Sequence, residues 1–390
     1  MFENIICQDE IVNALRADLA SGRLPSSILL WGPDFSGKLS VALELARVLS
    51  CEEKQARWSC GCKACEAHRL LAHPHTILIG GRYFYEETSA CADSLIKTGS
   101  LAARYLFIRA VRKLLRRFDA FLWEGDPDFK KIMPLLGAAE EAVEQLLPEK
   151  ELPSGEKLAQ ISEAACGAVK KICEAINPDS IPIALLRRAV SWSHAGASGA
   201  GKVIIIENAD KMRDSSRNSL LKILEEPPPH VTFILTTPRR AAILPTILSR
   251  VRTYRFIPRT REANRQVLEK IFRAEASRFE NLRDFFRVFQ GIDPLALRTE
   301  ARAFLEKAGT GAFPGEESWF TDKTKFRIFL HELSDTLERT LRGETCGPEV
   351  SVNKLEEWTA LIRKTLESLD VLNIAPALLA QRLFNSIGRP

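Results

Sequence analysis

Long apolar segments are missing from this sequence. No run approaches the ~20 consecutive apolar residues that a helix needs to span a bilayer, so we expect no membrane contact. Residues 1–6 also lack a basic region followed by a long apolar stretch, and no secretory signal is predicted. Internal repeats and low-complexity tracts are not evident either. These absences favour a cytoplasmic protein.

A strong excess of one charge is missing as well. The 55 Lys and Arg residues against 50 Asp and Glu give a net charge of +5, which permits contact with nucleic acid without requiring it. The 390 residues are enough for two or three domains, with 45% hydrophobic and 27% charged residues. Such a composition is typical of a globular protein.

One hydroxyl is missing from an otherwise recognisable phosphate-binding loop. Gly32 to Lys38 follow the apolar run 28–31 with the spacing G-x-x-x-x-G-K. A working loop of this kind places Ser or Thr after the lysine, because that hydroxyl binds the Mg²⁺ of the nucleotide. Leu39 stands there instead, and Ser40 comes one residue late. The loop therefore indicates a nucleotide-motor fold that has lost its own hydrolysis.

Strands and helices alternate on both sides of a long helical stretch. Strands are predicted at 28–31, 76–79, 203–206, 231–235 and 254–256, and helices at 9–21, 38–49, 183–192 and 215–224. This alternation implies a parallel sheet covered on both faces. Residues 83–176 are predicted to form a helical insertion. The chain is helical again after Pro258, with a loop at 309–314.

Four of the nine cysteines lie close together in the sequence. Cys51, Cys60, Cys62 and Cys65 fall within fifteen residues, and clustered thiolates in a reducing compartment most often hold structural Zn²⁺. Only Gly61 separates Cys60 from Cys62, which strains simultaneous ligation. Two alternatives stay open: free thiols left over from a lost site, or a substitute ligand from one of the histidines 68, 73 and 75.

Several motifs resemble the clamp-loader subunits of bacterial DNA polymerase III, within the AAA+ class of ATPase folds. The strongest match is 218–228 (Asn-Ser-Leu-Leu-Lys-Ile-Leu-Glu-Glu-Pro-Pro), followed by 243–250, which ends in Ser249-Arg250, and by the cysteine cluster. The resemblance implies an AAA+ core at 1–257, a small helical lid at 258–308 and an all-helical collar domain at 315–390. It does not cover the insertion.

The second nucleotide motif of this family is altered too. Glu207 keeps a carboxylate at the end of the strand 203–206, but Asn208 replaces the residue that would polarise the attacking water, and an amide is no base. At our best alignment Pro294 stands where active relatives carry a sensor arginine. The matching positions of this degenerate nucleotide site are Gly32, Gly37, Lys38, Glu207 and Thr237. We expect ATP and Mg²⁺ to bind weakly at most.

Arg250 is the catalytic candidate. In the family this arginine reaches the γ-phosphate held by a neighbouring subunit, an arginine-finger role. Keeping it while losing the loop chemistry resembles the delta-prime type of subunit. The resemblance implies gamma/tau-like and delta-like subunits, a sliding clamp and primed DNA as partners.

Two alternatives remain. The first is an active ATPase of the gamma/tau type, against which Leu39 and Asn208 argue. The second is a zinc-containing nucleic-acid-binding adaptor that reads phosphates with a basic amphipathic helix in the insertion. A solvated polar face is the simpler interpretation of that helix. Its cations are Arg104, Arg109, Arg112, Lys113, Arg116 and Arg117.

Apolar stripes in the last segment either form a local core or pack against partner helices, and only the resemblance implies the latter. They include Trp358, Ile362, Leu369, Leu379 and Leu383.

Overall fold

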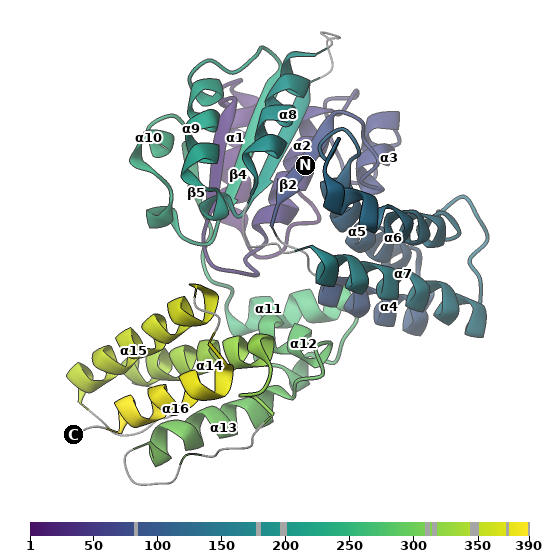
Figure 1. Ribbon diagram of the computed structural model, residues 1–390. Coiled ribbons are helices and arrows are strands. Elements are labelled where there is room, and N and C mark those ends of the chain that lie inside the picture. The colour runs from purple at the N-terminus through teal and green to yellow at the C-terminus, as the bar shows by residue number, and fades with distance from the viewer. Residues whose placement is uncertain are drawn as a thin grey trace. The chain divides into compact units, whose positions relative to one another are not determined.

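A computed structural model describes residues 1–81, 85–176, 181–195, 201–308, 313, 318–343, 351–371 and 374–388. The chain divides into two compact units, Met1–Phe289 and Gln290–Pro390, shown in Figure 1. None of the described helices is long and apolar enough to cross a bilayer. The three-domain division expected from the sequence stays a prediction.

The first unit is built on a five-stranded sheet in which every strand pair is parallel. The strand order is β2-β3-β4-β1-β5. The strands are β1 (Ser27–Trp31), β2 (Thr76–Gly80), β3 (Lys202–Glu207), β4 (Val231–Thr237) and β5 (Arg252–Arg255). The predicted α/β fold with a parallel sheet is confirmed, and β5 begins and ends slightly earlier than the strand expected at 254–256.

Helices cover both faces of this sheet. The helices of this unit outside the insertion are α1 (Asp9–Ala20), α2 (Lys38–Leu49), α3 (Lys63–Arg69), α8 (Ile183–His194), α9 (Asp214–Glu225), α10 (Pro245–Leu248), α11 (Arg261–Val267) and α12 (Leu282–Val288). Among them, α2 contacts β1, β3 and β4, and α8 contacts β2.

Alternating residues of β3 enter two different cores. Ile204 and Ile206 lie in one cluster with the insertion helices, whereas Val203 and Ile205 lie in the other with α1, α2 and the cysteines. All four are at most 1% exposed. A strand buried on both faces needs a continuous run of β-branched residues, which explains the sequence Val-Ile-Ile-Ile.

The predicted insertion consists of four helices that pack on one another, α4 (Tyr85–Thr98), α5 (Leu101–Leu115), α6 (Pro127–Glu144) and α7 (Gly155–Ala175). Figure 1 shows them as one group. A short 3-10 turn, η1 (Arg116–Phe118), continues α5 and contacts β2. The apolar side of α5 is buried through Phe107, Ile108, Val111 and Leu114.

The second unit is entirely helical in its described part. It contains α13 (Pro294–Lys307), α14 (Lys323–Leu341), α15 (Val352–Val371) and α16 (Pro376–Ile387). The apolar stripes of this segment meet one another: Trp358, Ile362, Leu369, Leu379 and Leu383 are all buried in one core. Of the two readings left open, a local core therefore accounts for these residues.

We expect Ile205→Ala to lower the free energy of unfolding by roughly 2–5 kcal/mol, because it opens a cavity at the centre of the sheet. Chemical denaturation of the full chain measures this. Ile96→Ala is the matched control, since Ile96 on α4 is 44% exposed and its truncation should change stability by less than about 0.5 kcal/mol. Equal losses for the two variants would contradict the assigned core.

Candidate functional site

The phosphate-binding loop connects β1 to α2, and two of its glycines are required by geometry. Gly32 has φ +147°, and a Cβ there would lie 2.4 Å from the carbonyl oxygen of Phe256. Gly37 is in the left-handed region, with φ +97°, directly before α2. Larger residues at these positions would clash or strain the backbone. The loop therefore keeps the shape of a phosphate-binding loop.

Lys38 is bonded to the loop itself. Its Nζ donates to the carbonyl oxygens of Gly32 and Pro33, both at 2.6 Å, and the side chain is buried. Leu39 packs into the core with 8% exposure, whereas Ser40 is exposed. The position after Lys38 thus carries no hydroxyl group, as the sequence predicted, and none of the described residues supplies one there.

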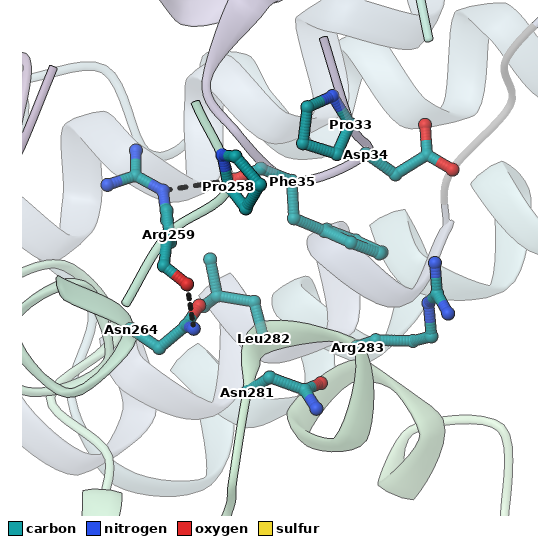
Figure 2. Close-up of a pocket in the computed structure, with 9 residues that line it drawn as sticks. All are labelled: Pro33, Asp34, Phe35, Pro258, Arg259, Asn264, Asn281, Leu282 and Arg283. Atoms are coloured by element: carbon teal, nitrogen blue, oxygen red, sulfur yellow. Dashed lines mark hydrogen bonds between the residues drawn. The ribbon is translucent and has the colours of Figure 1, made fainter. Parts of the chain in front are cut away.

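A cavity of about 190 Å³ lies beside this loop (Figure 2). Arg259 borders it and fixes the loop, because its Nε donates to the carbonyl of Phe35 (3.0 Å) and its Nη1 to that of Ile6 (2.7 Å). The ring of Phe35 stacks on Phe286 at 5.6 Å. The volume is below that of most ligand pockets, which measure about 300–1,000 Å³. The full lining is Pro33, Asp34, Phe35, Pro258, Arg259, Asn264, Asn281, Leu282 and Arg283.

The ends of β3 and β4 bring the second nucleotide motif together. Asn208 is in the left-handed region (φ +53°), and its N–H donates to Thr236 Oγ1 at 3.3 Å. Thr237 is fully buried, and its hydroxyl donates to Asp210 at 2.8 Å. Asp210 was not among the predicted site residues. Thr237 is therefore held by the segment that follows β3.

Glu207 is paired with an arginine from the insertion. The carboxylate Oε2 accepts a hydrogen bond from Nη2 of Arg117, and each side chain is 4% exposed. The sequence did not point to Arg117 as part of the site. The contact joins residues 90 positions apart, and the insertion lies outside the family resemblance, so no motif marks it.

The sequence predicted a solvated basic face on α5, and the structure contradicts this. Arg104, Arg112 and Arg117 are buried, and Arg104 donates to the carbonyls of Leu146, Leu147 and Lys150. The remaining cations bond to the chain as well. Arg109 donates to the carbonyls of His68 and Arg69, Arg112 to Glu140 and Leu70, Lys113 to Glu87, and Arg116 to the carbonyls of His73 and Thr76. These cations fasten α5 to its surroundings, and a phosphate-reading role for them gains no support.

Arg250 lies after α10 and is partly exposed, with 32% of its side chain accessible. It forms an ion pair with Glu225 at the end of α9, whose carboxylate accepts from Nε at 2.8 Å and also from Nη2. Its Nη1 donates to the carbonyl of Thr246 at 2.7 Å. Glu225 belongs to the strongest family motif, yet its contact with Arg250 was not predicted. The two motifs that carried the resemblance thus meet at this ion pair.

The four predicted cysteines come together beside α2 and α3. All four are buried, and their Sγ atoms lie within 4.8 Å of one another. The Sγ atoms of Cys51 and Cys60 are 3.8 Å apart, and a tetrahedral zinc site with Zn–S bonds of 2.3 Å separates its sulfurs by about 3.8 Å. The single residue between Cys60 and Cys62 therefore does not prevent the cluster.

Positive charge supports the cluster. The buried Arg47 donates from Nη1 to Cys65 Sγ at 3.0 Å and is itself paired with Glu44 at 2.6 Å. Burial disfavours ionisation of Cys62, but hydrogen bonds from the backbone amides of Cys65 and Glu52 lower its pKa to about 7. At Cys65, burial raises the pKa well above its ordinary value although Arg47 opposes this shift. The hydrogen bonds to Cys62 and the charge of Arg47 thus favour the thiolates that a metal requires, and burial opposes them.

The three histidines form a separate stack. The rings of His68 and His73 lie 4.2 Å apart, and His75 meets His73 edge-on at 5.6 Å. Burial, together with the charges of His73 and Arg109, lowers the pKa of His68 to about 2, so this ring is neutral. Among the described residues, the group of side chains that could hold a metal ion consists of the four cysteines and includes no histidine.

Comparison with known families identifies the family of this chain. The family model for "DNA polymerase III, delta subunit" matches residues 7–260. The chain belongs to this family. The match spans the loop, the cysteine cluster, the insertion and Arg250.

Individual relatives match shorter segments. The delta′ subunit of DNA polymerase III from Yersinia pestis is 40% identical over 73 residues, which is 18% of this chain and 21% of the relative. The gamma/tau subunit from Mycobacterium bovis is 43% identical over 65 residues, 16% of this chain and 11% of the relative. The chain thus matches about a fifth or less of the length of these curated relatives.

Among solved structures, a gamma subunit-related protein from Thermotoga maritima is similar over 54% of this chain and 80% of its own, with 15% identity and a TM-score of 0.33.

Arg117→Met should lower the free energy of unfolding by roughly 3–5 kcal/mol, because it removes one side of a buried ion pair and leaves the charge of Glu207 in place. The double variant Arg117→Met/Glu207→Gln should recover part of this loss. Denaturation curves of the three proteins measure both effects. Lys97→Met is the control, since its pair with Asp93 is exposed (64% and 42%) and contributes little. A double variant that loses as much stability as Arg117→Met would contradict the expected cost of the buried Glu207 charge.

Proposed function

We propose that this chain is a delta-prime-like clamp-loader subunit that does not hydrolyse ATP itself and donates Arg250 to a neighbouring ATPase subunit. The family membership supports a clamp-loader role. The observation that carries the finer assignment is a contrast within one chain: the nucleotide site is closed by its own groups, whereas Arg250 is accessible.

Three residues of the nucleotide site carry the first half of this contrast. Lys38 is bonded to loop carbonyls, Leu39 is part of the core, and Glu207 is paired with Arg117. Lys38 keeps its charge, but Leu39 removes a hydroxyl for Mg²⁺ and the ion pair with Arg117 occupies a carboxylate for Mg²⁺, two contributions to phosphoryl transfer. An active gamma/tau-type ATPase needs both of them, so this alternative gains no support from the site.

Arg250 has the properties that a donated arginine needs. A guanidinium keeps its charge at all physiological pH values and can bind two phosphate oxygens at once. The neighbour's γ-phosphate would have to replace Glu225 as the partner of Arg250. Because Glu225 is 49% exposed, breaking this ion pair costs little free energy. In trans, the guanidinium would stabilise the charge that develops on the transferred phosphoryl group.

We further propose that Cys51, Cys60, Cys62 and Cys65 hold a structural Zn²⁺. Four thiolates fill a tetrahedral zinc site and leave no position for water, so the metal would serve folding rather than catalysis. It would fasten the segment between α2 and α3 at the C-terminal end of α2.

The proposed partners follow from the family. They are gamma/tau-like and delta-like subunits, the sliding clamp and primed DNA, in the cytoplasm where bacterial replication takes place. The described helices of the second unit are the proposed collar, and nucleotide would bind this chain weakly at most.

Arg250→Ala should abolish the ATP turnover that this chain adds to its motor subunits in the assembled loader. An arginine finger contributes about 10³–10⁵ in rate in other P-loop NTPases, so we expect the neighbouring site to lose on the order of 10³-fold. Clamp- and DNA-stimulated ATP hydrolysis of the reconstituted complex measures this.

Arg265→Ala is the matched control for this test, because Arg265 is also exposed and also pairs with a glutamate of its own chain, Glu269 at 3.0 Å. It should keep full stimulation. Stimulation that survives in Arg250→Ala, with assembly intact by gel filtration, would contradict the donor role.

Purified wild-type chain should carry a single zinc ion, and Cys65→Ser should lose it and unfold at a lower temperature. Elemental analysis and thermal denaturation with and without a chelator give the two readouts. Cys166→Ser, on α7 and outside the cluster, should keep the metal. Wild-type protein without stoichiometric zinc after expression in zinc-supplemented medium would support the free-thiol alternative instead.

A further inference from the structure

The pairing of Arg117 with Glu207 has a consequence for divalent cations. Glu207 lies at the end of β3, where the second nucleotide motif would be expected to carry a Mg²⁺-binding acid. Its Oε2 accepts from Arg117, and both side chains are 4% exposed. A guanidinium next to a carboxylate repels a divalent cation and occupies the oxygen that would bind it.

The other residues do not fit Mg²⁺ either. Protein sites usually bind this ion through one or two carboxylates, with phosphate oxygens and water completing an octahedron. Leu39 offers no oxygen and is buried in the core. Asn208 turns into the left-handed region beside Thr236. Of the other carboxylates in these motifs, Asp34 is exposed on the loop and Asp210 accepts from Thr237. Glu207 is thus the candidate ligand at the end of β3, and it already has a cationic partner.

The insertion holds Arg117 in this position. Nη1 of Arg117 donates to the carbonyl of Lys113 one helical turn earlier, and the carbonyl of Arg117 accepts from Trp123 Nε1 at 2.7 Å. The preceding Arg116 donates to the carbonyls of His73 (3.0 Å) and Thr76 (2.9 Å), at the start of β2. The guanidinium is therefore fixed from both sides by contacts that span the insertion and the sheet.

We propose that Arg117 is a built-in replacement for the divalent cation, which makes the nucleotide site of this chain independent of Mg²⁺. The insertion is then a device that keeps the site closed to metal, in addition to the missing hydroxyl. The proposal deepens the non-hydrolysing role proposed above. It concerns this chain's own site, so its failure would leave the donation of Arg250 untouched.

The test restores the hydroxyl with and without Arg117. The affinity of a fluorescent ATP analogue is measured in Mg²⁺ and in EDTA for wild type, Leu39→Thr, Arg117→Gln and Leu39→Thr/Arg117→Gln. Binding by wild type and Leu39→Thr should be the same in both buffers, whether weak or undetectable. In Leu39→Thr/Arg117→Gln, Mg²⁺ should strengthen binding by at least about fivefold, the lower end of typical site-to-site coupling.

Two controls isolate the charge of Arg117. Leu39→Thr/Arg117→Lys keeps a cation beside Glu207 and should stay independent of Mg²⁺. Leu39→Thr/Arg104→Gln removes a different buried arginine of the insertion, on α5. Its binding of the analogue should also stay independent of Mg²⁺. Circular dichroism establishes that each variant is folded.

Two results would overturn the proposal. Mg²⁺-dependent binding in wild type or in Leu39→Thr would show that Glu207 binds the cation despite Arg117. These two proteins keep the buried pair, so this arm holds even if Arg117→Gln fails to fold. A folded Leu39→Thr/Arg117→Gln protein without Mg²⁺ dependence would show that Arg117 is not what excludes the ion.

Discussion

A carboxylate buried at the end of a central strand requires a positive charge beside it, and this requirement joins the two parts of the first unit. Burying Glu207 alone would cost several kcal/mol, and Arg117 compensates for it from the insertion. Because η1 carries Arg117, the insertion has to pack against β2, where Arg116 caps the backbone of His73 and Thr76. The helices α4–α7 are thus tied to the sheet at the place where a nucleotide motif would need an open carboxylate.

Two further groups of charged and cysteine residues occur in the first unit. On one side of the sheet α2, the cysteine cluster and the Arg47–Glu44 pair form a core of their own. The family motif at the end of α9 and the family motif that follows α10 meet in the ion pair of Glu225 with Arg250. That pair is accessible, whereas Lys38, Leu39 and Glu207 are buried. This difference in exposure is what supports the proposed donation of Arg250 to a partner subunit.

Much of this could be predicted from local sequence. The β-branched run 203–206 marks a strand buried on both faces, and the loop 32–38 with Leu39 reveals both the nucleotide fold and its defect. The cysteine cluster could be predicted because its four members lie within fifteen residues, although their ability to meet across the short Cys60–Cys62 spacing depended on the local backbone. The polar face of α5 was predicted wrongly. Periodicity shows which side of a helix is polar, but whether that side faces solvent or buried carbonyls depends on packing over more than 40 residues, as for Arg104 and Leu146. Arg117 and Glu225 were missed for the same reason.

ATP turnover by the isolated, metal-replete chain at saturating Mg²⁺–ATP tests the central claim most directly. The account predicts no turnover above the background of a Lys38→Ala variant, because the loop hydroxyl is missing and the Glu207 carboxylate is already paired. Robust turnover that Lys38→Ala abolishes would contradict it and would make this chain a motor subunit of the gamma/tau type.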